Sequence, residues 1–296
     1  MNRIKGILYA AASSSTFGLV PFFTIILLID GFSIFELLAY RCGVAALVMW
    51  LAGKLSGKSF RLTGKEFCVV FMLSLFCAIT AFSLVIAYQN IASGVASTIH
   101  FMYPLAVALT MMFFFKEKKS IWVIVAILMS LVGAYLLSSG DSTVKNGNTF
   151  LGIMTACISV FSYAAYIIGV RKTRAVRINS TILTCYVMGI GTIFYIIGSF
   201  CTSGLHLVTD WYIWLLILGL AIPATAISNI TLVLAIKHVG PTLTAILGAL
   251  EPLTAVIIGV LVFQETFTVN SALGILLIVT AVCIVVLREN RTKGNR

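Results

Sequence analysis

Charged residues are scarce in this sequence. Only 10% of the 296 residues are Asp, Glu, Lys or Arg, and 60% are hydrophobic, whereas a soluble domain has about 25% charged residues. A soluble fold of this length could not cover its surface with so few charges. This composition excludes soluble enzymes, nucleic-acid-binding proteins and secreted disulfide scaffolds.

Residues and motifs for catalysis are also lacking. The chain has 9 acidic residues and 3 histidines, and it contains no H-E-x-x-H, G-x-S-x-G, Walker A or G-x-G-x-x-G motif. None of its 7 cysteines forms a C-x-x-C pair, so we expect them to be packing residues rather than metal or redox sites. The sequence therefore predicts a protein that is not an enzyme, with no catalytic residues, metal or cofactor.

Long apolar runs are what the sequence has in place of these features. Charged and turn-rich breaks separate ten of them, at about 6–29, 34–52, 66–87, 94–115, 121–138, 150–170, 181–201, 211–234, 242–263 and 270–287. The runs are too long for barrel strands, and helices satisfy their own backbone in lipid. We expect an all-α integral membrane protein with ten transmembrane helices, the first being retained rather than cleaved as a signal peptide.

The positive charges predict the orientation of these helices. All Lys and Arg residues except Lys145 and Arg41 fall in the N-terminal segment, in alternate loops or in the C-terminal tail. Cytoplasmic loops of membrane proteins carry an excess of Lys and Arg. We therefore expect both termini to be cytoplasmic and the protein to lie in a plasma membrane, the inner membrane in a bacterium.

The two halves of the chain resemble each other. When the second half is aligned on the first, Pro104 falls on Pro252, Tyr103 on Glu251 and Glu117 on Glu265. This predicts a five-helix repeat over 1–140, a polar linker over 141–149, and a second repeat with a short basic tail over 150–296. An odd number of helices in each repeat inserts the second copy upside down, as in many secondary transporters.

Several motifs carry a resemblance to a known family. They are Tyr-Pro at 103–104, Leu-Glu-Pro-Leu at 250–253, Phe-Gln-Glu at 263–265 and the segment AYRCGVAALVMWL at 39–51. Together with the ten helices in two sets of five, they resemble the EamA branch of the drug/metabolite transporter superfamily. The resemblance covers nearly the whole chain and implies transport of amino acids, other metabolites or drugs.

Charged side chains inside the membrane are costly and need a compensating role. Arg41 could bind a substrate carboxylate, turn outward or pair with Glu36, although a spacing of five residues makes that pair poor. Glu251 could bind a substrate amine, carry a proton or hydrogen-bond a neighbouring helix. His100 could line a cavity or hydrogen-bond another helix.

Further polar and aromatic residues lie at helical spacing within the apolar runs. The candidate substrate-binding set comprises Glu251, His100, Tyr103, Arg41, Ser14, Ser162, Tyr163, Tyr166 and Asn229. Hydroxyls in membrane helices often only bond across helices. Pro104 and Pro252 free a carbonyl at equivalent positions and are predicted hinges.

These observations predict a secondary active transporter of small organic metabolites that works by alternating access, and the family resemblance implies export of an amino acid or a similar metabolite. A lipid or lipid-linked-sugar flippase of the same fold is the first alternative, and a receptor or an intramembrane enzyme is less favoured. The expected partners are a small-molecule substrate, membrane lipids and protons as one candidate coupling ion, but no nucleic acid. The protein could be a monomer or a homodimer.

Overall fold

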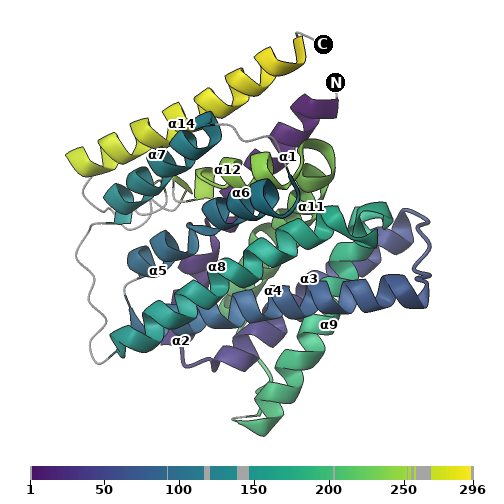
Figure 1. Cartoon of the computed structure of the whole chain (residues 1–296). Helices are drawn as coiled ribbons and strands as arrows, with labels where there is room; N and C mark the ends of the chain where they lie inside the picture. Colours follow the sequence, from purple (N-terminus) through teal and green to yellow (C-terminus); the bar gives the residue numbers. More distant parts are fainter. Residues whose placement is uncertain are drawn as a thin grey trace.

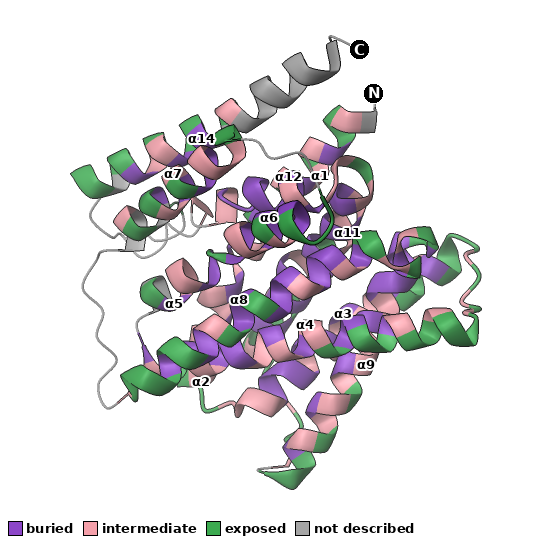
Figure 2. Ribbon diagram, in the orientation of Figure 1, coloured by how far each residue is buried: buried purple, intermediate pink, exposed green. Residues whose placement is uncertain are grey.

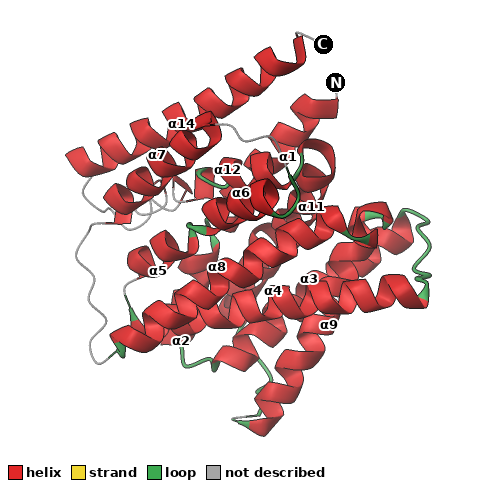
Figure 3. Cartoon of the chain, viewed as in Figure 1, coloured by secondary structure: helices red, strands yellow, loops and turns green. Residues whose placement is uncertain are grey.

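The computed structural model describes residues 2–91, 93–116, 121–138, 147–202, 204–251, 253–254, 257 and 268–294. Every regular element in this part of the chain is helical (Figures 1 and 3). The elements of the first half are α1 (Asn2–Phe17), α2 (Val20–Ile29), α3 (Ile34–Leu55), α4 (Gly64–Asn90), α5 (Ser93–His100), α6 (Tyr103–Phe113) and α7 (Ile121–Ser138). Those of the second half are α8 (Thr149–Lys172), η1 (Arg174–Arg177), α9 (Ser180–Cys201), α10 (Trp211–Ala221), η2 (Ile222–Ile227), α11 (Ser228–Val239), α12 (Pro241–Leu247) and α14 (Val269–Gly294).

Seven helical stretches of the described residues are long and apolar enough to cross a membrane. They are Arg3–Ile29, Ile34–Leu55, Gly64–Asn90, Val95–Phe113, Thr149–Lys172, Ser180–Cys201 and Trp211–Val239. Two shorter apolar helices, Ile121–Gly133 and Ala272–Ala281, fall within predicted segments. Of the segment predicted over 242–263, residues 252, 255–256 and 258–263 lie outside the described residues. The all-helical membrane fold agrees with the sequence, whereas the count of ten helices stays a prediction.

Polar residues in the loops determine where several helices begin. Thr63 and Glu66 form a reciprocal capping box at the start of α4, in which each side chain accepts from the other residue's backbone N–H. Ser33, Asn148 and Asp210 cap the first turns of α3, α8 and α10 in the simpler one-sided way. Such caps satisfy N–H groups that the helix itself leaves unpaired.

Three of the spanning stretches are interrupted near a proline. The first stretch breaks at Gly18 and Leu19 before Pro21, and the fourth breaks at Phe101 and Met102 before Pro104. In the stretch over 211–239, the backbone widens into the π-helix η2, which contains Pro223. A proline cannot donate to the carbonyl four residues earlier, so the α-helical ladder cannot continue unchanged through it.

The contacts between helices are symmetric: replacing each helix by its equivalent in the other half gives the same set of contacting pairs. The most extensive contacts join α3 with α9, α4 with α8, α7 with α14 and α1 with α11. Figure 1 shows α7 and α14 side by side along one edge of the molecule. In the repeat alignment α1 corresponds to α8 and α4 to the α10–α11 stretch, so the pairs α1–α11 and α4–α8 are equivalent, as a pseudo-twofold axis requires.

Large apolar side chains cover the outside of the bundle. Residues such as Phe67, Phe71, Phe150, Phe161 and Ile197 are exposed on the helices, and Figure 2 shows exposed positions along the outer faces of α4, α8 and α9. A soluble monomer rarely exposes extended apolar patches. These faces are suited to lipid, in agreement with the sequence prediction of a membrane protein.

Candidate functional site

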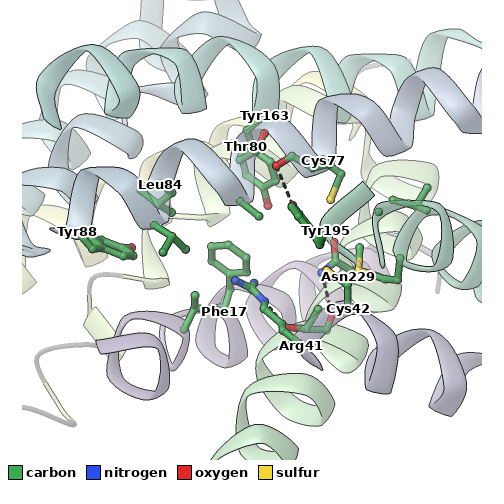
Figure 4. Close-up of a pocket in the computed structure, with 18 residues that line it drawn as sticks. Phe17, Arg41, Cys42, Cys77, Thr80, Leu84, Tyr88, Tyr163, Tyr195 and Asn229 are labelled. Atoms are coloured by element: carbon green, nitrogen blue, oxygen red, sulfur yellow. Dashed lines mark hydrogen bonds between the residues drawn. The ribbon is translucent and has the colours of Figure 1, made fainter. Parts of the chain in front are cut away.

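A central cavity lies between helices of both halves (Figure 4). The space between its lining side chains, counted together with the solvent at its open side, is about 620 Å³. Its lining residues are Phe17, Val20, Arg41, Cys42, Cys77, Ala78, Thr80, Ala81, Leu84, Val85, Tyr88, Tyr163, Val187, Met188, Gly191, Tyr195, Thr225 and Asn229. Pockets for small organic ligands have this character, with mostly apolar walls and a few polar groups.

Arg41 is the one charged side chain among the described residues that line the cavity. It comes from α3 and is 5% exposed. Its Nε donates a hydrogen bond of 2.7 Å to Thr225 Oγ1. Figure 4 shows the guanidinium reaching toward the cavity beside Phe17.

The π-helix η2 positions the partner of Arg41. Thr225 Oγ1 donates to the carbonyl of Leu220, five residues earlier, at 2.7 Å. Because the hydroxyl proton is used there, an oxygen lone pair faces the Nε–H of Arg41. Asn229 Nδ2 donates to the Thr225 carbonyl at 2.8 Å, which fixes this cavity-lining amide against the same widened turn.

Glu36 is paired elsewhere and does not neutralise Arg41. Its carboxylate accepts a 2.9 Å hydrogen bond from the backbone N–H of His206 and lies 3.3 Å from His206 Nδ1. Tyr40 donates to the carbonyl of the same histidine. Of the possibilities that the sequence left open for Arg41, the structure thus excludes the pair with Glu36 and directs the guanidinium into the cavity.

His100 belongs to an aromatic cluster behind the cavity wall. Its Nδ1 is 2.9 Å from Ser159 Oγ, and its ring centroid is 5.5 Å from that of Tyr103 and 5.3 Å from that of Tyr163. Tyr163 lines the cavity, whereas His100, Tyr103 and Tyr166 do not. Within the described part of the chain, His100 therefore makes the inter-helix hydrogen bond and reaches the cavity only through Tyr163.

The serines of the predicted set make helix contacts. Ser14 Oγ donates to the Ala10 carbonyl in its own helix at 2.9 Å. Ser162 Oγ is 2.8 Å from Thr80 Oγ1, and Thr80 lines the cavity. The structure thus brings Arg41, Tyr163 and Asn229 to the cavity surface and leaves the two serines one layer behind it.

Glu251 lies beside this layer at a crossing of helices. Gly248, three residues before it, lies directly against the hydroxyl of Tyr103. The backbone carbonyl of Glu251 faces Gly18, where an added Cβ would come within 2.7 Å of that oxygen. Glu251 is not a lining residue of the cavity, and the predicted hinge Pro252 lies outside the described residues.

Other lining residues were not singled out from the sequence. Tyr88 and Tyr195 line the cavity together with Cys42 and Cys77, and Tyr195 donates to the Ala78 carbonyl at 2.8 Å. The available signal was weak, because Tyr88 directly follows the apolar run at 66–87 and only Tyr195 lies inside a run, at 181–201, where a buried phenol needs a hydrogen-bond partner.

Comparisons with known proteins identify the class of this fold and site. A protein crystal structure superposes with a TM-score of 0.81 at 18% identity, covering 98% of both chains, which shows a shared fold. An uncharacterized transporter from Archaeoglobus fulgidus is 25% identical over 220 residues, which are 72% of this chain and 74% of that protein.

The comparisons place the protein among multi-helix membrane transporters. The sequence model of the EamA-like transporter family matches residues 4–139 and again residues 150–287. The chain belongs to the EamA-like transporter family, and the family resemblance inferred from the sequence motifs is confirmed.

Proposed function

We propose that this protein is a secondary active transporter that exports small organic metabolites, with amino acids among the candidates, by alternating access. The observation that carries the proposal is the central cavity. Both family-matched segments contribute to its walls, and it contains the buried guanidinium of Arg41. A charged group buried inside a membrane bundle is expensive unless it serves a ligand or a pathway.

The symmetric contacts between equivalent helices of the two halves support alternating access. If the two segments are inverted repeats, each can adopt the conformation of the other, and the exchange moves the opening of the cavity across the membrane. The breaks at 18–19 and 101–102 and the π-helix η2 give the helices places at which to bend. In this proposal ten helices form two inverted repeats with both termini in the cytoplasm, and Pro104 and Pro252 act as hinges.

Glu251 is the candidate coupling group of this mechanism. Gly248, three residues before Glu251, lies against Tyr103. The ring of Tyr103 packs on that of the cavity-lining Tyr163. A proton bound by Glu251 on one side of the membrane and released on the other would couple transport to a pH gradient. His100, with its ring against Tyr163, is the second candidate for this role.

Purified protein in proteoliposomes tests the proposal. A panel of metabolites is loaded inside or outside, with and without a pH gradient, and flux is measured. We expect saturable flux that Ala81→Phe abolishes, because Ala81 lines the cavity on α4 and the added ring fills it. Cys68→Phe is the matched control, since Cys68 is exposed on the same helix.

The outcomes separate the alternatives. Unchanged flux in Ala81→Phe would show that this cavity is not the transport path. Movement of labelled lipids between leaflets, with no flux of any water-soluble metabolite, would instead favour the flippase. Ala81→Phe is compared with the parent only after both elute as folded, monodisperse protein.

A further inference from the structure

We propose that the cavity selects monocarboxylic acids with an apolar body, and that it binds the carboxylate through the two terminal nitrogens of Arg41. This inference rests on the proposed function and names its substrate class. Among the described residues, no carboxylate lies against this guanidinium, and a ligand anion completes the site.

The orientation of the guanidinium is the first argument. Nε is fixed on Thr225 Oγ1 at 2.7 Å, and Thr225 is itself 1% exposed and fixed on Leu220. With Nε held, the planar group cannot rotate freely. Its terminal nitrogens project from the same plane toward the space that Figure 4 shows beside Phe17. A preorganised fork of this kind matches a carboxylate, which accepts two parallel hydrogen bonds.

The charge of the site is the second argument. The buried guanidinium carries one positive charge, and the nearest acidic residue on its own helix, Glu36, is committed to His206. A buried cation is strongly favoured to acquire an anion. A ligand with a single negative charge balances it, whereas a phosphate ester would bring a second charge that no other described lining residue matches.

The walls of the cavity are the third argument. Most of the lining around Arg41 is apolar, including Val20, Ala81 and Leu84. Phe17 and Tyr163 stack at a centroid distance of 6.2 Å and present an aromatic surface. Such walls take an aliphatic or aromatic body, and they make the desolvation of a ligand ammonium costly. The site therefore favours a simple carboxylic acid over the corresponding amino acid.

Equilibrium binding to purified protein in detergent tests this inference without requiring transport. The probes are 4-methylpentanoate, its neutral amide 4-methylpentanamide, leucine and 3-methylbutylamine. The pair 3-phenylpropionate and 3-phenylpropanamide tests an aromatic body. We expect each carboxylate to bind at least about 10-fold more tightly than its amide, since hydrogen bonds to charged groups are the stronger ones. Leucine should bind less tightly than 4-methylpentanoate, and the amine should not bind.

Three variants assign the effect to Arg41. Arg41→Gln should remove the preference for carboxylate over amide. Arg41→Lys keeps the charge but loses the fork, so binding should persist about 10-fold weaker. Arg171→Gln is the matched control, because it removes the same charge from an exposed arginine that donates to the Lys237 carbonyl, and it should bind like the parent.

The results that overturn the inference differ from those that overturn the proposed function. Equal binding of acid and amide, failure of both acids to bind, or full carboxylate binding by Arg41→Gln refutes the carboxylate site. If another metabolite is transported and Ala81→Phe blocks that flux, the proposed function stands while the inference falls. Arg41-dependent carboxylate binding without any flux in proteoliposomes leaves the site standing and refutes the transport function. If Arg41→Gln does not fold, Arg41→Lys provides the test. Carboxylate binding by Arg41→Lys as tight as that of the parent would refute binding through the two terminal nitrogens of the guanidinium.

Discussion

Gly248 offers the sharpest test of how the two halves meet. Its backbone has φ −55° and ψ −19°, a conformation that any residue can adopt, so glycine is not required there for the turn itself. Space is the constraint. A Cβ at this position would lie 1.8 Å from Tyr103 Oη and 2.7 Å from the Ala245 carbonyl oxygen.

The expected cost of Gly248→Ala follows from what surrounds Tyr103. This side chain is 3% exposed, and its ring lies 4.7 Å from that of Tyr163 and 5.5 Å from that of His100. It cannot move away without displacing the cluster behind the cavity wall. Overpacking of a tight interior typically costs about 1–3 kcal/mol, and we expect Gly248→Ala to lose this much unfolding free energy together with most of its transport.

A double-mutant cycle tests the steric explanation. Tyr103→Phe removes the oxygen at 1.8 Å and leaves Cζ at 3.0 Å from the added methyl group. Gly248→Ala should therefore cost at least about 0.5 kcal/mol less in the Tyr103→Phe background than in the parent. The contact with the Ala245 backbone persists, so the rescue is partial. Unfolding is followed in mixed micelles titrated with a denaturing detergent. Equal costs in both backgrounds would refute the reasoning.

Three further predictions concern other parts of the molecule. Glu36→Ala should speed amide hydrogen exchange in residues 204–210, because the His206 N–H loses its acceptor. Glu36→Gln keeps an acceptor oxygen and should change the exchange rate little. Identical exchange rates in the two variants would contradict this prediction. Glu251→Gln keeps size and hydrogen bonding but fixes a neutral side chain, and it should lose accumulation driven by a pH gradient while keeping exchange. Uphill transport like that of the parent at every pH tested would remove Glu251 from the coupling step. A single cysteine at Ser56, in a background without other cysteines, should resist a membrane-impermeant thiol reagent applied from outside, and labelling there would reverse the proposed orientation.

The sequence was most informative about the helices, for a physical reason. An uninterrupted apolar run of about 20 residues has one backbone solution in lipid. The described parts of the predicted segments are helical apart from short breaks such as those at 18–19 and 101–102. The break at 101–102 could be anticipated from Pro104. The π-helix could not, because a shift from four-residue to five-residue hydrogen bonding leaves no pattern in composition even with Pro223 in view.

The candidate site was predictable only in part. Arg41 could be recognised because a charge in the membrane requires compensation. Its partner Thr225 and the alternative partner of Glu36, His206, come from distant segments of the chain. Helical spacing reveals that a polar face exists, but not whether that face meets a cavity or another helix. His100 illustrates this limit, since its polar contact is with Ser159 of α8.

The π-helix at Ile222–Ile227 also bears on how ligand preference can change over time. A π-turn holds one residue more than the α-helical turn that it replaces. Losing one residue within η2 would therefore let the turn close into ordinary α-helix while α10 and α11 keep their relative phase. The change would fall on Thr225, which lies within the turn and accepts the hydrogen bond of Arg41. A one-codon deletion here would thus alter the surroundings of the buried guanidinium without rearranging the helices on either side.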